Sequence, residues 1–163
     1  MVFSEKEISK IRGMYVTARQ FKNIVNVDEL VPTPKNNFKN KIYPFIVNKS
    51  FACEVYLKLI LMATQKKKKR GHNLKELSQI TNMDTQFKNY LLSNKLKLTD
   101  QEFEEYLNNI SNAFEKWRYI YEKKNIKVMY GFLNTFCIFL DEYCINLMKE
   151  LFNIDVDKEL LYI

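Results

Sequence analysis

The sequence predicts an all-α protein, on two observations of its composition. Only three Gly and three Pro occur among 163 residues, too few for the many tight turns of a β-sandwich. Apolar residues make up 47% of the chain and aromatic residues 14%, which is enough for a hydrophobic core and unlike a disordered chain. Because the chain has no internal repeat and no low-complexity linker, we expect a single domain over residues 1–163.

The first helix is expected over Ser4–Asn26. Ser4 and Glu7 have the spacing of a capping box, in which each side chain bonds the other residue's backbone N–H. Apolar residues then recur at steps of three and four, as on one face of a helix. The next segment, Val31–Tyr43, contains two prolines and several Asn and Lys, and we expect a surface loop there.

Pro44 suits the first turn of a second helix, where its missing N–H costs nothing. The pattern from there to about Gln65 is apolar on most sides, which is typical of a central helix. A basic loop over 66–71 ends this helix, because Gly71 can stop it and cations suit its last turn. Short helices are expected over His72–Ile80 and Asp84–Leu92.

A second capping box opens a long helix at Thr99, with Glu102 as its partner. This helix is expected to reach about Lys124, with an aromatic stripe on one face. A last long helix is expected over Val128–Phe152, and the tail Asn153–Ile163 adds a final turn or packs as an extended end.

The sequence also excludes several classes of protein. Charges at Ser4–Arg12 occupy the place where a signal peptide needs an apolar core, so we expect a cytoplasmic protein. The longest uncharged stretch, Val128–Leu140, is too short to cross a membrane. The three cysteines, Cys53, Cys137 and Cys144, sit in apolar surroundings and are expected to be reduced core residues.

Ligand-binding motifs are equally few. The single His and the lack of any Cys-x-x-Cys pair give no spacing for a metal site, and no cofactor is expected. The three glycines, Gly13, Gly71 and Gly131, are too far apart to form a phosphate-binding loop. No catalytic residue is therefore assigned from motifs of these kinds.

Charges inside apolar helical stretches are the most informative residues. Glu54 and Lys58 lie four apart in the central helix, and Arg118 and Glu122 repeat that spacing in the long helix. A buried charge is costly unless it is paired, so we expect these faces to meet in one polar cluster, with His72 close by. The cluster either fixes helix packing alone or binds phosphate, nucleotide or RNA, since both roles leave the same pattern.

A basic patch follows the central helix. Its members are Lys66, Lys67, Lys68, Lys69 and Arg70. The patch is either a solvated loop or a surface that contacts phosphates, and the net charge of +7 is compatible with a polyanionic partner. No aromatic residue interleaves the run, so the run alone does not indicate a platform for base stacking.

Three segments in order, Asn48–Leu61, Gly71–Leu77 and Phe114–Glu122, resemble HEPN domains. The resemblance covers about Pro44–Leu151, with Ser4–Asn26 as a plausible first helix. It implies a helical bundle of four or five main helices plus short ones, and a homodimer. Many HEPN domains are metal-independent ribonucleases of toxin–antitoxin and phage-defence systems, often encoded beside a nucleotidyltransferase. Other members bind nucleotides or RNA without catalysis.

The chain departs from the nuclease members at their Arg-x4–6-His motif. At those offsets Arg118 is followed by Lys123, Lys124 and Asn125, and the sole histidine, His72, lies upstream. Because cleavage through the ribose 2′-OH needs a base, the usual HEPN ribonuclease activity is not expected. Our leading hypothesis is non-catalytic binding of RNA or nucleotide in a defence or toxin–antitoxin setting, with a nucleotidyltransferase as a candidate partner. The alternatives are a divergent ribonuclease using Glu54, His72 and Arg118, and a purely structural dimerisation module.

Overall fold

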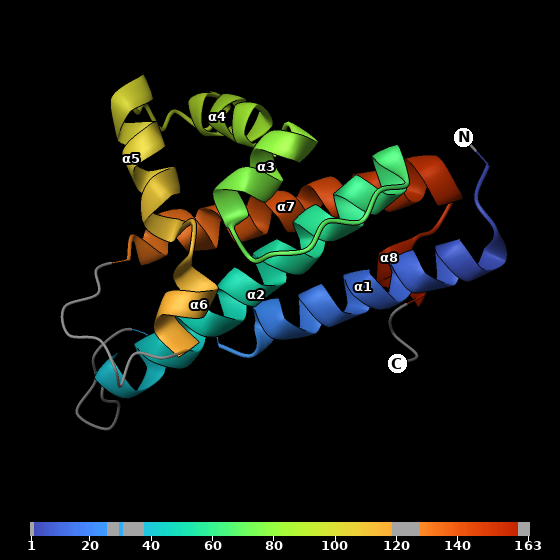
Figure 1. The fold of residues 1–163 in the computed structure, drawn as a ribbon, viewed down its shortest axis with the longest axis horizontal. Helices are drawn as coiled ribbons and strands as arrows, with labels where there is room; N and C mark the ends of the chain where they lie inside the picture. Colours follow the sequence, from blue (N-terminus) through green and yellow to red (C-terminus); the bar gives the residue numbers. More distant parts are fainter. Residues whose placement is uncertain (1, 26–29, 31–37, 119–127, 160–163) are drawn as a thin grey trace.

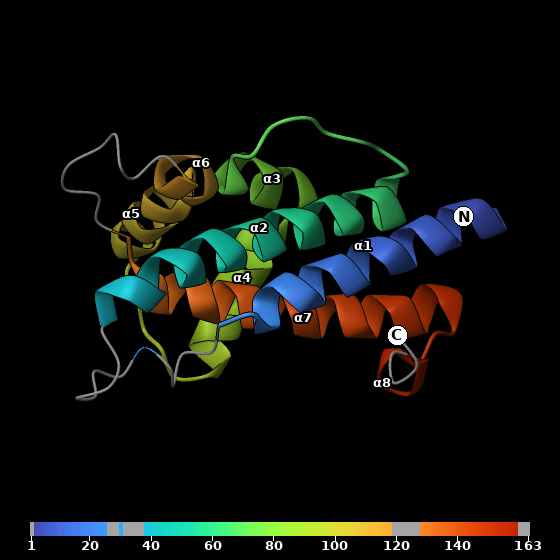
Figure 2. The ribbon, with the colours of Figure 1, turned by 90° about the horizontal axis from the view of Figure 1, so that it is seen from below.

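Three long helices run side by side in the computed structural model of the protein, and shorter helices cover them (Figures 1 and 2). The structure describes residues 2–25, 30, 38–118 and 128–159, and within these ranges it contains helices and no strand. The all-α prediction is therefore confirmed. The helices are α1 (Glu5–Asn23), α2 (Phe38–Gln65), α3 (Leu74–Thr81), α4 (Met83–Ser93), α5 (Asp100–Ile110), α6 (Ala113–Arg118), α7 (Tyr130–Phe152) and α8 (Val156–Glu159).

Helix α2 is the central element, as predicted. It contacts α1 and α7 along its length and also contacts α3 and α6. Figure 1 shows α1 running opposite to α2, and α7 running in the same direction as α2. At its start, α1 has the predicted capping box of Ser4 and Glu7, and the cap of Thr99 and Glu102 likewise opens α5.

The start of α2 corrects one prediction. The helix begins at Phe38, so the expected loop is wrong over 38–43, while residues 31–37 lie outside the described part. Pro44 therefore stands inside the helix instead of in its first turn. Ile42 is only 7% exposed and continues the buried stripe of Phe45 and Ile46. Burial of an Ile side chain contributes about 1.5–3 kcal/mol, which offsets much of the cost of about 3 kcal/mol for an internal proline.

The helix expected from Thr99 to about Lys124 is interrupted after Ile110. The carbonyl of Ser111 accepts a hydrogen bond of 2.7 Å from the N–H of Leu74, the first residue of α3. The Ser111 hydroxyl donates to the carbonyl of Asn108 at 2.8 Å. These bonds satisfy one unpaired N–H of α3 at the expense of helix continuity, and α6 starts in a new direction.

The thiols of Cys53, Cys137 and Cys144 are buried and free, as expected for core cysteines. Burial raises the pKa of the Cys53 and Cys144 thiols well above its usual range, which keeps them protonated. Helix α7, which carries two of these cysteines, starts and ends within two residues of its predicted bounds.

A buried aspartate, Asp141, joins the three long helices. Its Oδ1 accepts hydrogen bonds from Tyr56 of α2 at 2.7 Å and from Tyr15 of α1 at 3.2 Å, and its Oδ2 pairs with Lys22 of α1. Beside it lies Lys49, a residue only 5% exposed, whose ammonium donates to the carbonyl of Lys22 at 2.7 Å. We call these five residues the Asp141 cluster; it fixes how α1, α2 and α7 pack.

The Asp141 cluster shifts the titration of its members. Burial, together with the negative charge of Asp141, raises the pKa of the Tyr56 and Tyr15 hydroxyls far above the ordinary value. Burial also lowers the pKa of the Lys49 ammonium. Both tyrosines therefore stay protonated and donate hydrogen bonds at neutral pH.

Candidate functional site

Glu54 on α2 is the buried centre of a small ionic cluster, which we call the Glu54 cluster. Its Oε1 lies 2.7 Å from Nζ of Lys58, one helical turn further on, and its Oε2 lies 2.8 Å from Nδ1 of His72. The Glu54 side chain is 4% exposed, whereas that of His72 is 43% exposed. Both carboxylate oxygens are thus bonded, so the buried charge of Glu54 is compensated.

The course of the basic loop explains why His72 reaches Glu54. After α2 ends, the chain runs back along that helix towards the start of α3 (Figure 1). Gly71 adopts a φ of 102°, a conformation that suits glycine, just before His72. Asn73 then caps α3 by accepting a hydrogen bond of 3.0 Å from the N–H of Glu76. The cap and the glycine together hold His72 beside α2.

A hollow of about 180 Å³ lies between α1, α2 and the basic loop. We call it the lysine hollow. Its lining consists of five lysines and two methionines: Lys10, Met14, Lys58, Met62, Lys67, Lys68 and Lys69. Lys58 belongs both to this lining and to the Glu54 cluster, so the two features are continuous.

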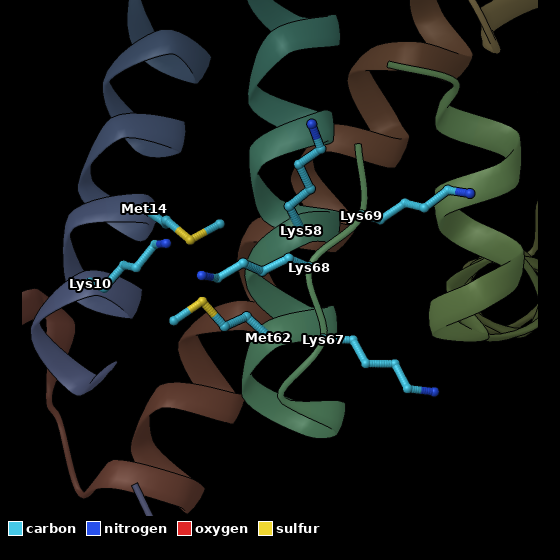
Figure 3. A pocket seen from close by; sticks show the side chains of 7 residues that line it. All are labelled: Lys10, Met14, Lys58, Met62, Lys67, Lys68 and Lys69. Carbon is cyan, nitrogen blue, oxygen red and sulfur yellow. The ribbon is translucent and has the colours of Figure 1, made fainter. Parts of the chain in front are cut away.

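The lysine side chains point in different directions (Figure 3). Lys10 and Lys68 point towards each other across the space between α1 and α2, with Met14 and Met62 beside them. Among the residues that the structure describes, neither ammonium has a carboxylate partner. An anion between these two ammoniums would relieve their repulsion, and the thioethers would shield it from water.

The other lining cations are partly engaged. Lys58 pairs with Glu54, and Lys69 pairs with Glu76 at 2.6 Å. Both side chains of the pair of Lys69 and Glu76 are exposed, so the pair contributes little to stability. Lys69 can therefore exchange Glu76 for another anion. Lys67 and Lys69 point away from α1, on the other side of the loop (Figure 3).

The predicted basic patch does not act as one unit. Lys66 leaves the hollow and lies over the ring of Phe3, donates to the carbonyl of Val2 and pairs with Glu7 at 3.6 Å. This residue therefore fastens the loop to the start of α1. Arg70 is exposed and does not line the hollow. The patch thus supplies Lys67, Lys68 and Lys69 to the hollow, and the other two residues lie elsewhere.

The second predicted charge pair, Arg118 and Glu122, lies at the edge of the described residues. Arg118 ends α6, with its side chain outside the described part, and Glu122 lies in 119–127, also outside it. Helix α6 contacts α2 and places the ring of Phe114 5.5 Å from that of His72, measured between ring centroids. The structure thus brings together Glu54, Lys58 and His72, while the contribution of Arg118 and Glu122 stays a prediction.

The sequence did not reveal the contribution of α1 to the lysine hollow. Lys10 and Met14 lie four residues apart on that helix, which the sequence marked only as a first amphipathic helix. Their spacing places both side chains on one face of the helix, which can be predicted from the sequence. That this face lies opposite Lys68 cannot be predicted from the sequence. Phe114 belongs to the aromatic stripe of the helix expected from Thr99, and only the turn after α5 brings it to His72.

Comparison with protein-family models, with curated proteins and with solved structures finds no match to this chain. None of the helices in the described ranges combines the length and the apolar character that crossing a bilayer requires. Nor do three or more His, Cys, Asp or Glu side chains gather into a metal-binding group in that part of the chain.

Proposed function

We propose that this protein binds phosphate groups of RNA or of a nucleotide at the lysine hollow, without cleaving them. The observation that carries the proposal is the approach of Lys10 and Lys68 towards each other across a hollow that contains no carboxylate in its lining. Two like charges facing each other are unfavourable unless an anion joins them. Phosphate oxygens are strong acceptors for lysine ammoniums, which bind them as point charges.

The charge balance around the hollow supports the same proposal. Five lysine residues contribute to its lining, and two of them are paired with carboxylates, Lys58 with Glu54 and Lys69 with Glu76. The surplus cations can release counterions from a polyanion, which is the main source of sequence-independent binding to nucleic acids. The net charge of +7 also attracts polyanions, and it does so over a longer range.

The resemblance of three segments to HEPN domains supports a setting for this binding. It suggests a toxin–antitoxin or phage-defence protein of the cytoplasm that forms a homodimer and has a nucleotidyltransferase as partner. The missing Arg-x4–6-His motif supports binding without the usual ribonuclease chemistry.

A divergent ribonuclease is the second candidate, favoured by one observation. The Glu54 carboxylate holds Nδ1 of a partly exposed His72, an arrangement that orients an imidazole for proton transfer. Incubation of purified protein with RNA distinguishes the two candidates. Intact RNA is the expected result, and cleavage that disappears in Arg118→Ala or His72→Ala would favour the nuclease.

Binding is tested by fluorescence anisotropy of a labelled RNA oligonucleotide and by titration with ATP, both at low salt. The variant Lys10→Ala/Lys68→Ala removes two ammoniums from the hollow. We expect at least about tenfold weaker binding and a salt slope reduced by about 1.4, at about 0.7 per phosphate contact on a single strand.

The control variant is Lys97→Ala/Lys149→Ala, which makes the same change of net charge at two exposed lysines outside the hollow. It should bind almost as the parent protein does. Equal losses in both variants would mean that only net charge matters. Failure to bind either RNA or ATP would favour the structural dimerisation module.

A further inference from the structure

We propose that the ring of His72, backed by Phe114, is a nucleobase subsite beside the lysine hollow, and that the ligand is a single-stranded nucleic acid. This inference rests on the proposed function, because it assigns the phosphate to the hollow. It adds a second position, where a base of the same strand stacks on an exposed ring.

The size and lining of the lysine hollow suit a phosphate group better than a whole nucleotide. Its volume of about 180 Å³ is below the roughly 300–1,000 Å³ of sites that enclose a small organic ligand. Its lining has no aromatic ring and no side chain that could accept hydrogen bonds from a base. A phosphate group fits these dimensions and donors, so we place the base of the same nucleotide outside the hollow.

His72 offers the ring that such a base needs. Its side chain is 43% exposed, and its Nδ1 is fixed by Glu54 at 2.8 Å. Phe114 supports it, with ring centroids 5.5 Å apart and planes inclined by 37°. Phe51 follows at 5.4 Å from Phe114, and Phe21 at 4.5 Å from Phe51, so an aromatic row leads from the helix interface to this exposed ring.

The ring and the hollow are joined through one carboxylate. Glu54 binds His72 with Oε2 and Lys58 with Oε1, and Lys58 lines the hollow. A ligand that reaches Lys58 therefore also reaches the surroundings of the His72 ring. Exposed rings beside a cationic groove are the arrangement by which proteins bind single strands, because every base has a stacking face.

The remaining cations favour a strand over a free nucleotide. Lys67 and Lys69 project from the far side of the loop, away from Lys10 and Lys68 (Figure 3). One phosphate cannot contact both sets, but successive phosphates of a strand can. A duplex would hide its base faces, so only the phosphate contacts would remain for it.

The test compares two variants that separate the ring of His72 from its hydrogen bond. His72→Asn keeps an N–H donor for Glu54 and lacks the ring, whereas His72→Phe keeps a ring and lacks the donor. Anisotropy measures binding to a labelled single-stranded oligouridylate of 12 nucleotides. Competition by inorganic polyphosphate, which has no bases, measures the phosphate contacts alone.

We expect His72→Asn to weaken RNA binding about fivefold to a hundredfold, the range for one lost stacking contact, and His72→Phe to bind within about threefold of the parent. Polyphosphate affinity should be the same in all three proteins. Duplex RNA and ATP should compete less well than the single strand.

Equal losses in both variants, or no loss in His72→Asn, would overturn the base subsite. If polyphosphate binds and the bases add nothing to the affinity for RNA, the proposed base subsite is refuted, while the proposed phosphate site is supported. If neither polyphosphate nor RNA binds at low salt, the proposed function itself fails. Circular dichroism of each variant verifies that the helices are intact.

Discussion

The hydroxyl of Tyr56 donates a hydrogen bond of 2.7 Å to Oδ1 of Asp141, and both side chains are buried. The same carboxylate also binds α1, because it accepts a hydrogen bond from Tyr15 and pairs with Lys22. One charged group thus holds three helices at defined positions. The contribution of this carboxylate to the free energy of unfolding can be measured directly, because removing it leaves several buried donors without an acceptor.

Asp141→Ala is expected to lower the free energy of unfolding by about 3–5 kcal/mol, the cost of breaking a buried pair by removing one partner. Chemical denaturation followed by circular dichroism measures it. Glu150→Ala, at an exposed position of the same helix, is the control and should change stability by less than about 0.5 kcal/mol. If Asp141→Ala also lowered the free energy of unfolding by less than about 0.5 kcal/mol, the cluster would not be what holds the helices together.

Stability should fall at alkaline pH because of the Asp141 cluster. The raised pKa of Tyr56 means that the folded protein keeps a proton which the unfolded chain releases above about pH 10. The free energy of unfolding should therefore decrease as pH rises beyond that value, by up to about 1.4 kcal/mol per pH unit for this group. In Tyr56→Phe the decrease should be shallower, with lower stability at neutral pH. Parallel curves for the two proteins between pH 9 and 11 would contradict this.

The extent of the Glu54 cluster can be found with a double-mutant cycle. Arg118→Ala is expected to destabilise the protein, and with Glu54→Gln it should show a coupling energy of about 1 kcal/mol or more. The reason is that both residues carry charges on helices that pack together. Lys67→Ala, at an exposed position, should have little effect. Additive effects of the two substitutions would place Arg118 outside the cluster.

A homodimer is expected, from the resemblance to HEPN domains and from the abundance of apolar stripes. Within the described residues, several large apolar side chains are exposed, including Ile24, Tyr43, Met129 and Tyr130. Light scattering in the tens of micromolar should give twice the 19.6 kDa of the chain. The mass of a single chain at that concentration would refute the prediction.

The sequence was informative wherever a local pattern controls the structure. The capping boxes at Ser4 and Thr99, and the apolar face of the last long helix, predicted their elements because capping and periodicity involve neighbours within one or two turns. The pair of Glu54 and Lys58 could be predicted for the same reason, since four residues make one turn. The proximity of His72 followed from its place after the central helix.

Contacts between distant segments could not be predicted in this way. The start of α2 at Phe38 depended on the burial of Ile42, and the break after Ile110 depended on a hydrogen bond to Leu74. In the sequence, Asp141 only follows the uncharged stretch Val128–Leu140, yet in the fold it is the buried acceptor for Tyr15 and Tyr56. Each of these outcomes depends on a partner far away in the sequence.

The all-α class, the main helices and the surplus of lysines after the central helix can thus be predicted from local sequence patterns. Which lysines come together, and which ring lies beside them, depends on how the helices pack. The lysine hollow needs Lys10 from α1 and Lys68 from the loop, and the subsite needs Phe114 from α6. Helix periodicity is a property of adjacent turns, whereas the meeting of these side chains depends on how whole helices pack against one another.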